Sequence, residues 1–178
     1  MLKGKKITLR PIKVEDAKHT LELRYDVEAN KALIAYPFPV NIENEKEWIE
    51  NLYPKGIREN IYFAIEENSS KNYVGYLSLQ KINYINRNGN FGVIILRKFR
   101  GKDYSVEAMK LFFDYIFDQI NLRKIKLEVL KENNKAIKIY KDLGFNEEGL
   151  LKEHIYQDGK YKDLLVMSLL SDDFGNKI

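Results

Sequence analysis

The middle of the chain passes from an apolar run through a basic turn into an amphipathic segment, and this order constrains the fold most. Residues 91–96 are apolar apart from one glycine, which predicts a buried strand. Residues 104–120 carry apolar side chains at helical spacing, which predicts a helix. The turn between them contains Arg97, Lys98, Arg100 and Lys102. Because the first amides of a helix have no partner within it and lie at the positive end of its dipole, this turn is a candidate phosphate site.

Shorter strand and helix patterns surround this centre. Runs bounded by turn residues predict strands at residues 7–12, 61–65, 73–79, 91–96, 124–130, 145–156 and 161–170. Helical patterns cover residues 14–26, 27–33, the region around Trp48, 104–120 and 133–143. Turn-rich spacers favour antiparallel hairpins, with a hairpin signal at Asp158-Gly159. The sequence therefore predicts one α+β domain over residues 1–178, a mostly antiparallel sheet with helices on both faces and one central strand–helix–strand crossover.

Composition excludes several kinds of function. The chain has no cysteine, which rules out disulfides, thiolate metal sites and cysteine nucleophiles, and its two histidines are isolated in the sequence, so no metal site is expected. No apolar run reaches the length of a membrane span, and the first residues lack the apolar core of a signal peptide. A net charge of +4 without interleaved aromatic and basic residues does not indicate nucleic-acid binding. We expect a soluble, cytoplasmic protein that contacts neither membrane nor nucleic acid.

Three motifs together resemble one family. Arg100-Gly-Lys-Asp-Tyr-Ser105 is similar to the acetyl-CoA signature Gln/Arg-x-x-Gly-x-Gly/Ala, and residues 133–145 match the pattern Asn-x-x-Ala-x-x-x-Tyr-x-x-x-Gly-Phe over its full length. Glu148-Gly149 and residues 158–163 match a closing hairpin. Over nearly its whole length the chain resembles the Gcn5-related N-acetyltransferases, within them the ribosomal-protein alanine and spermidine acetyltransferases.

The resemblance implies a fold, a co-substrate and site residues. Acetyl-CoA would place its pyrophosphate on the amides of a turn and helix start, and its pantetheine arm along a strand where the sheet splays apart. Asn133 would hydrogen-bond the co-substrate, although a helix N-cap is its simplest structural role. Tyr140 would stand near the sulfur and protonate the leaving thiolate, the alternative being a core tyrosine with a wet hydroxyl. The implied contacts in the turn are Arg100, Gly101, Lys102, Asp103, Tyr104, Ser105 and Val106, and those along the strand are Ile94, Ile95 and Leu96.

Two positions depart from the signature. Asp103 and Ser105 stand where glycine, and glycine or alanine, are usual. Either side chain could cap the following helix, and the Asp103 carboxylate could instead weaken binding of an anionic co-substrate. The second possibility leaves open a degenerate, non-catalytic CoA-binding regulatory module.

The acceptor is expected to be a primary amine that attacks the thioester directly in a ternary complex. Carboxylates and an aromatic wall would suit a polyamine such as spermidine, and Asp26, Glu28, Glu43 and Trp48 are the candidate contacts. Further glutamates follow at positions 45, 47 and 50, and the alternative is a solvated acidic face with Trp48 in the core. A protein N-terminus or an amino sugar stays open as the acceptor. A homo-oligomer stays open as the state of assembly. No histidine or glutamate is expected beside the central strand, so a water molecule would relay the proton.

Overall fold

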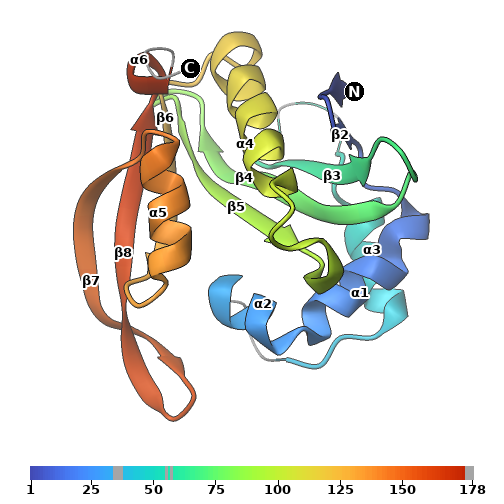
Figure 1. Cartoon of the computed structure of the whole chain (residues 1–178), viewed down its shortest axis with the longest axis horizontal. Coiled ribbons are helices and arrows are strands. Elements are labelled where there is room, and N and C mark those ends of the chain that lie inside the picture. Colours follow the sequence, from blue (N-terminus) through green and yellow to red (C-terminus); the bar gives the residue numbers. More distant parts are fainter. Residues whose placement is uncertain (34–37, 55, 57, 175–178) are drawn as a thin grey trace.

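This computed structural model describes residues 1–33, 38–54, 56 and 58–174. Within these residues, eight strands form one sheet in the order β1-β2-β3-β4-β5-β6-β8-β7 (Figure 1). All neighbouring strands are antiparallel except β5 and β6, which the helix α4 connects in parallel. The strands are β1 (Leu2–Lys3), β2 (Ile7–Arg10), β3 (Ile61–Glu67), β4 (Tyr73–Asn83), β5 (Asn88–Ile95), β6 (Lys124–Leu130), β7 (Asn146–Gln157) and β8 (Lys160–Leu170). The predicted α+β class, antiparallel hairpins and central crossover are confirmed.

The helices agree closely with their sequence patterns. They are α1 (Ala17–Tyr25), α2 (Val27–Leu33), α3 (Ile42–Glu50), α4 (Tyr104–Asp114), α5 (Asn134–Asp142) and α6 (Ser171–Phe174), with short 3-10 turns η1 (Val14–Asp16) and η2 (Arg97–Phe99). Residues 104–120 were predicted to form one continuous α-helix, and this is wrong at the C-terminal end. After Asp114 the helix widens into a π turn, η3 (Tyr115–Gln119), in which the Ile120 amide donates a hydrogen bond to the Tyr115 carbonyl at 3.2 Å. None of the described helices is long and apolar enough to cross a membrane.

The helices cover both faces of the sheet, as predicted. Successive residues of a strand point to opposite faces, and β3 shows where each helix lies. The ring of Phe63 meets Phe112 of α4, with centroids 6.0 Å apart, whereas the ring of Tyr62 meets Trp48 of α3 at 5.7 Å. Phe112 is fully buried and also contacts the rings of Phe91 and Phe113, so several aromatic side chains pack between α4 and the sheet.

Strands β5 and β6 pair over only three positions and then diverge (Figure 1). Their last partners are Asn90 and Lys126, although β5 continues to Ile95 and β6 to Leu130. The Leu96 amide bonds the Val74 carbonyl at 2.9 Å, and hydrogen-bonding direction alternates along an antiparallel strand. The amides of Val93 and Ile95 therefore point away from β4, into the gap. This confirms the predicted splaying of the sheet.

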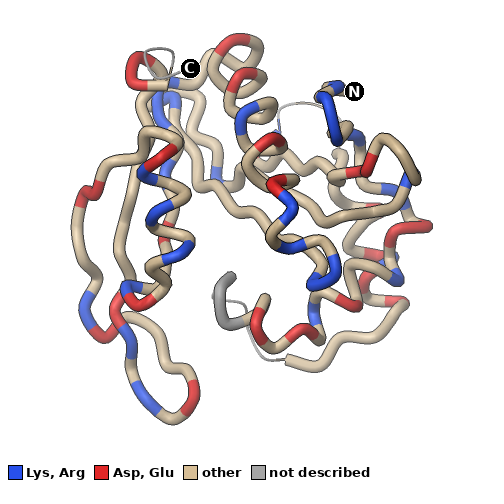
Figure 2. Tube along the Cα trace, in the orientation of Figure 1, with Lys and Arg blue, Asp and Glu red and all other residues tan. Residues whose placement is uncertain are grey.

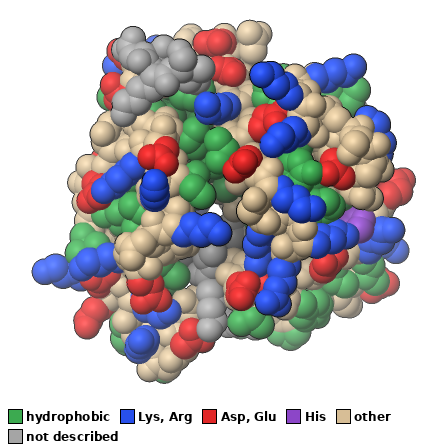
Figure 3. Space-filling view, viewed as in Figure 1, with side chains coloured by type: hydrophobic (Ala, Val, Ile, Leu, Met, Phe, Trp, Pro, Cys, Tyr) green, Lys and Arg blue, Asp and Glu red, His purple; other side chains and the backbone are tan. Residues whose placement is uncertain are grey.

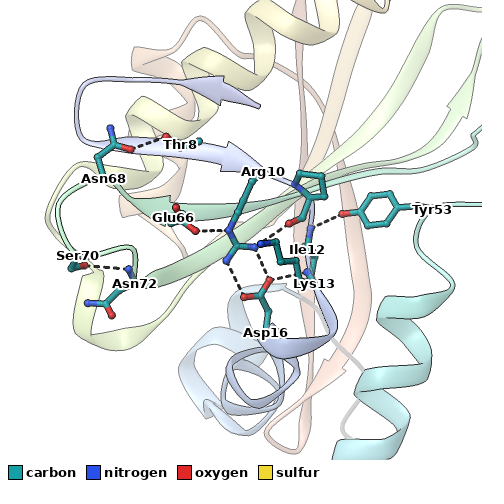
Figure 4. A network of polar contacts seen from close by, with 11 residues as sticks. Thr8, Arg10, Ile12, Lys13, Asp16, Tyr53, Glu66, Asn68, Ser70 and Asn72 are labelled. Carbon is teal, nitrogen blue, oxygen red and sulfur yellow. Dashed lines mark hydrogen bonds and ion pairs between the residues drawn. The ribbon is translucent and has the colours of Figure 1, made fainter.

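A buried ion cluster fixes the start of α1 against the sheet (Figure 4). Arg10 of β2 donates two hydrogen bonds to Asp16, at 2.7 and 2.9 Å, and one to Glu66 of β3 at 2.6 Å. Arg10 and Asp16 are both buried, and the Lys13 amide donates to the same aspartate at 2.8 Å. The Tyr53 hydroxyl accepts a hydrogen bond from the Ile12 amide at 2.7 Å. These contacts fix where α1 begins, and α2, which forms one wall of the site, follows α1 directly in the chain.

Candidate active site

A cavity of about 580 Å³ occupies the gap between the diverging strands. The space-filling view shows the molecule hollowed between α4 and α5, with basic side chains along the α4 side (Figure 3). Glu28 and Ala29 of α2 line it from one face of the sheet, while α4 and α5 line it from the other. The predicted site residues that line it are Glu28, Ile94, Ile95, Arg100, Gly101, Asp103, Tyr104, Ser105, Val106, Asn133 and Tyr140.

Five predicted contacts are not among the described residues that line this cavity: Asp26, Glu43, Trp48, Leu96 and Lys102. Leu96 directly follows the end of β5, and it is buried because its side chain packs into the core. The Lys102 ammonium lies over the ring of Phe99, 5.3 Å from its centroid. Asp26 lies next to the wall, because it bonds Arg100.

The start of α4 presents to the cavity backbone amides that have no partner within the helix. The first α-helical hydrogen bond runs from the Glu107 amide to the Asp103 carbonyl at 3.2 Å. The amides of Tyr104, Ser105 and Val106 precede it, and all three residues line the cavity. The side chain of Tyr104 donates a hydrogen bond to Glu67 of β3, which fixes this end of the helix. The arrangement can bind an anion through backbone amides.

Asp103 adopts the left-handed region, with φ 64°, directly at the N-cap of α4. Glycine takes this conformation without strain, which explains why the signature favours glycine here. Within the described chain, the Asp103 carboxylate caps none of the α4 amides, so the expectation of a capping aspartate is wrong. The capping alternative for Ser105 is also wrong, because Ser105 is already the second residue of the helix.

The guanidinium of Arg100 faces carboxylates rather than open solvent. It bonds the Ile95 carbonyl at 3.0 Å, Asp26 at 2.5 Å and Glu28 at 3.0 Å. Arg97 lies 3.9 Å from Glu28. Figure 2 shows the basic turn beside the acidic start of α2. We expected every basic side chain of the turn to attract an anionic ligand. Arg100 does not fit this expectation, because its guanidinium already pairs with the carboxylates of Asp26 and Glu28.

Asn133 and Tyr140 reach the cavity from the two ends of α5. The Asn133 side chain accepts a hydrogen bond from the Ala136 amide at 3.1 Å, which confirms the N-cap role. Tyr140 is half-buried, with its ring 5.6 Å from that of Phe145. Burial raises the pKa of Tyr140 to about 12. The hydroxyl therefore keeps its proton at neutral pH. The same rise widens the difference between the pKa of Tyr140 and that of a thiol, about 8.5, beyond the difference for an ordinary tyrosine.

Two glutamates line the cavity, so the expectation of none beside the central strand is wrong. Glu28 comes from α2, and Glu128 comes from β6 across the gap. The alternation on β6 buries Ile125, Leu127 and Val129, which leaves Glu128 on the other face. The sequence contained this alternation, but it did not show that the strands diverge and open that face to a cavity.

The acidic segment around Trp48 lies apart from this cavity. Glu45 is buried and accepts a hydrogen bond from Arg24 at 2.9 Å, while Glu43 is exposed. Trp48 packs against Tyr62 and Tyr76, which agrees with the alternative that Trp48 belongs to the core. The Arg24 guanidinium lies 5.5 Å from the centroid of the Trp48 ring. Trp48 and Tyr62 also line a second hollow of about 410 Å³. Among the described residues, no cluster of histidine and carboxylate side chains could hold a metal ion.

The splayed strands β5 and β6, the start of α4 and Tyr140 of α5 surround one cavity, an arrangement that fits an N-acetyltransferase. The chain belongs to the acetyltransferase (GNAT) domain family, whose model matches residues 6–146.

Curated relatives and solved structures agree with this assignment. The spermidine N(1)-acetyltransferase of Vibrio cholerae is 34% identical over 173 residues, covering 96% of each chain. That of Escherichia coli strain K12 is 31% identical, covering 94% of this chain and 88% of its own. A crystal structure of the Vibrio cholerae spermidine N-acetyltransferase with CoA and spermine superposes with a TM-score of 0.89, at 29% identity, covering 97% of this chain and all of the other.

Proposed function

We propose that this protein transfers an acetyl group from acetyl-CoA to a primary amine of a polyamine such as spermidine. The observation that carries the proposal is the cavity in the β5–β6 gap, with the first amides of α4 at one end and the carboxylates Glu28 and Glu128 on its walls. One end suits an anion and the walls suit a cation. The relatives named for spermidine acetylation, and the superposed structure that contains CoA and spermine, support the same pairing.

The residues that would hold acetyl-CoA fit its chemistry. The amides of Tyr104, Ser105 and Val106 would bind its diphosphate, and the outward amides of Val93 and Ile95 would hydrogen-bond its amide-containing arm as a neighbouring strand does. Acetyl-CoA, when bound, supplies an acetyl thioester. Aligning this group with the acceptor amine in one cavity accounts for much of the expected rate enhancement, because positioning alone replaces a bimolecular encounter.

Proton movements fall to three side chains of the cavity. Glu28 and Glu128 would bind the ammonium form of the acceptor, and one of them, directly or through water, would take the proton that the ammonium loses before it attacks. Tyr140 would give its proton to the departing thiolate and regain one, through water, from the nitrogen that becomes the amide; its raised pKa keeps it protonated for this role. The carboxylates favour an acceptor with several cationic nitrogens over an amino sugar with a single one.

Titration calorimetry with acetyl-CoA, followed by thiol-release assays, tests the proposal. We expect micromolar binding and the fastest release with spermidine or spermine among an amine panel that includes an amino sugar and a peptide N-terminus. Binding without release on any amine would favour the regulatory module. Fastest release on the peptide or the sugar would keep the acetyltransferase and reject the polyamine, whereas no heat at millimolar acetyl-CoA would reject both.

A further inference from the structure

Arg100 joins three parts of the site: the end of β5, the turn before α4 and the start of α2, which is distant in the sequence. Its Nε bonds the carbonyl of Ile95 at the end of β5, and its two terminal nitrogens bond Asp26 and Glu28 at the start of α2. The backbone of the same residue belongs to the turn that leads into α4. Its guanidinium side chain is only 29% exposed, so these contacts are partly shielded from water and salt.

The two carboxylates are not equivalent. Asp26 is 15% exposed, and its Oδ1 also accepts a hydrogen bond from the Ala29 amide at 3.1 Å, which caps α2. Burial by itself would raise the pKa of Asp26, but the hydrogen bonds from the Ala29 amide and Arg100 outweigh it and lower the pKa. Glu28 is 66% exposed and lines the cavity. Asp26 is therefore the fixed anchor, and Glu28 is the partner that faces a ligand.

Charge counting shows what this cluster attracts. One guanidinium faces two carboxylates, so the Asp26–Arg100–Glu28 unit carries a net charge of about −1 at neutral pH. Arg97 approaches Glu28 only at 3.9 Å, with a side chain 77% exposed, and is largely screened. To turn toward a phosphate, the Arg100 guanidinium would have to give up its ion pair with the partly buried Asp26. The unit as it stands suits a cation.

We infer that Arg100 is a positioning residue for the amine acceptor: through Asp26 it holds α2 against the end of β5, and it orients the Glu28 carboxylate toward the acceptor's ammonium group. This inference rests on the proposed polyamine acetylation. The turn thus divides its work, with its backbone amides serving the anionic co-substrate and the Arg100 side chain serving the cationic acceptor. Binding of the co-substrate by the turn is tied to the position of Glu28 through one side chain.

Arg100→Gln tests this role cleanly, because the signature admits glutamine at this position and the turn should keep its shape. We expect the Kd of acetyl-CoA, measured by calorimetry, to change less than about twofold. We expect the Kd of spermidine, measured calorimetrically with CoA present, and its KM to rise about fivefold or more, with kcat changing less. Lys98→Gln removes the same charge from the same turn without touching Asp26 or Glu28, and shows how much of any change is general electrostatics.

Asp26→Asn provides a second, independent variant. Asparagine still caps a helix, so α2 should stay folded while the ion pair with Arg100 is lost. We expect a rise in the Kd of spermidine, and the double variant Asp26→Asn with Arg100→Gln should show less than the product of the two single effects, because both remove one interaction. Circular dichroism and thermal unfolding confirm that the variants are folded.

The outcomes separate the alternatives. If Arg100→Gln weakens acetyl-CoA about tenfold and leaves spermidine binding unchanged, the side chain serves the phosphate and the inference is overturned. Unchanged binding of both ligands, or an effect equal to that of Lys98→Gln, overturns it as well. Failure of the unmodified protein to bind acetyl-CoA or to acetylate any amine would reject the proposed function and, with it, this inference. A natural protein that acetylates spermidine, with variants that split the two affinities as described, supports both.

Discussion

Glu45 of α3 is buried, with 1% of its surface exposed, and its Oε1 accepts a hydrogen bond from Nε of Arg24 at 2.9 Å. Its second oxygen is buried and has no hydrogen-bond partner among the described residues. Arg24 is therefore the cation that makes this buried charge tolerable. The acidic segment of α3 is not one uniform surface, since its exposed members can be lost without such a cost.

Arg24→Met should lower the free energy of unfolding by about 2 kcal/mol, because it leaves the Glu45 carboxylate buried without its counter-charge. We place the value below that of a fully buried pair since the Arg24 side chain is 38% exposed. Urea denaturation at pH 7 measures it. Lys46→Met, at an exposed position of α3 next to Glu45, should change stability by less than about 0.5 kcal/mol. Equal effects of the two variants would contradict the role of Arg24.

Tyr140→Phe should reduce kcat about 100-fold or more and change the KM of acetyl-CoA little, as expected for a proton donor that acts in the transition state. Steady-state kinetics measure both. Because burial raises the pKa of Tyr140 to about 12, its deprotonation should not limit kcat below about pH 10. Tyr156→Phe on the exposed hairpin is the matched control. Retention of more than half the activity by Tyr140→Phe would reduce this residue to a packing role.

Substitutions at Asp103 should separate backbone strain from charge. Asp103→Gly relieves the left-handed conformation and should raise the free energy of unfolding by up to about 1 kcal/mol, whereas Asp103→Ala should lower it. Asp103→Asn removes only the charge. We expect Gly and Asn both to bind acetyl-CoA a few-fold more tightly, more at low salt than at high. Tighter binding in Gly alone would assign the effect to the backbone, and weaker binding in both would show that the carboxylate is needed.

The pH dependence of stability should carry a contribution from His19. Its ring stacks on Tyr73 at 5.3 Å, and its pKa is lowered below 6.5 by burial and by Lys18 and Lys98, against the opposing charges of Glu22 and Asp16. The unfolded chain then binds the proton more readily, so stability should fall as pH drops through about 6.5.

The measurement for His19 is urea denaturation between about pH 7.5 and 5.5. His19→Phe keeps a ring on Tyr73 and removes the titrating group, so its stability should change less over this interval than that of the unaltered protein. A steeper loss in His19→Phe would show that the folded protein favours the charged histidine, contrary to the stated direction.

Much of the fold could be predicted from the sequence because local patterns decide it. Alternation located β6 over Lys124–Leu130, and helical spacing with an N-cap located α5 after Asn133. The short strand β1 (Leu2–Lys3) escaped prediction, since two residues cannot show a period. The π turn after Asp114 escaped because its apolar residues still fit an ordinary helix.

The site was predictable where it depends on backbone and not where it depends on side-chain partners. The turn pattern indicated a phosphate site around Gly101 and Ser105, and the family resemblance added Tyr140; all three residues line one cavity. The sequence could not show that Arg100 turns toward Asp26 across 74 residues, nor that Glu128 faces an opened strand edge. Such contacts depend on how distant elements pack, and local patterns do not contain that information.

The three-position ladder between β5 and β6 also has a consequence for the order in which the molecule is assembled. The pair Asn88–Lys124 spans a shorter stretch of chain than the pair Ile7–Glu67, which joins β2 to β3. Because contacts of larger sequence separation form at greater entropic cost, the β5–β6 junction should form before β2 is added to the sheet. The cavity exists only once the β5–β6 junction has formed, so neither half of the sheet can make it alone.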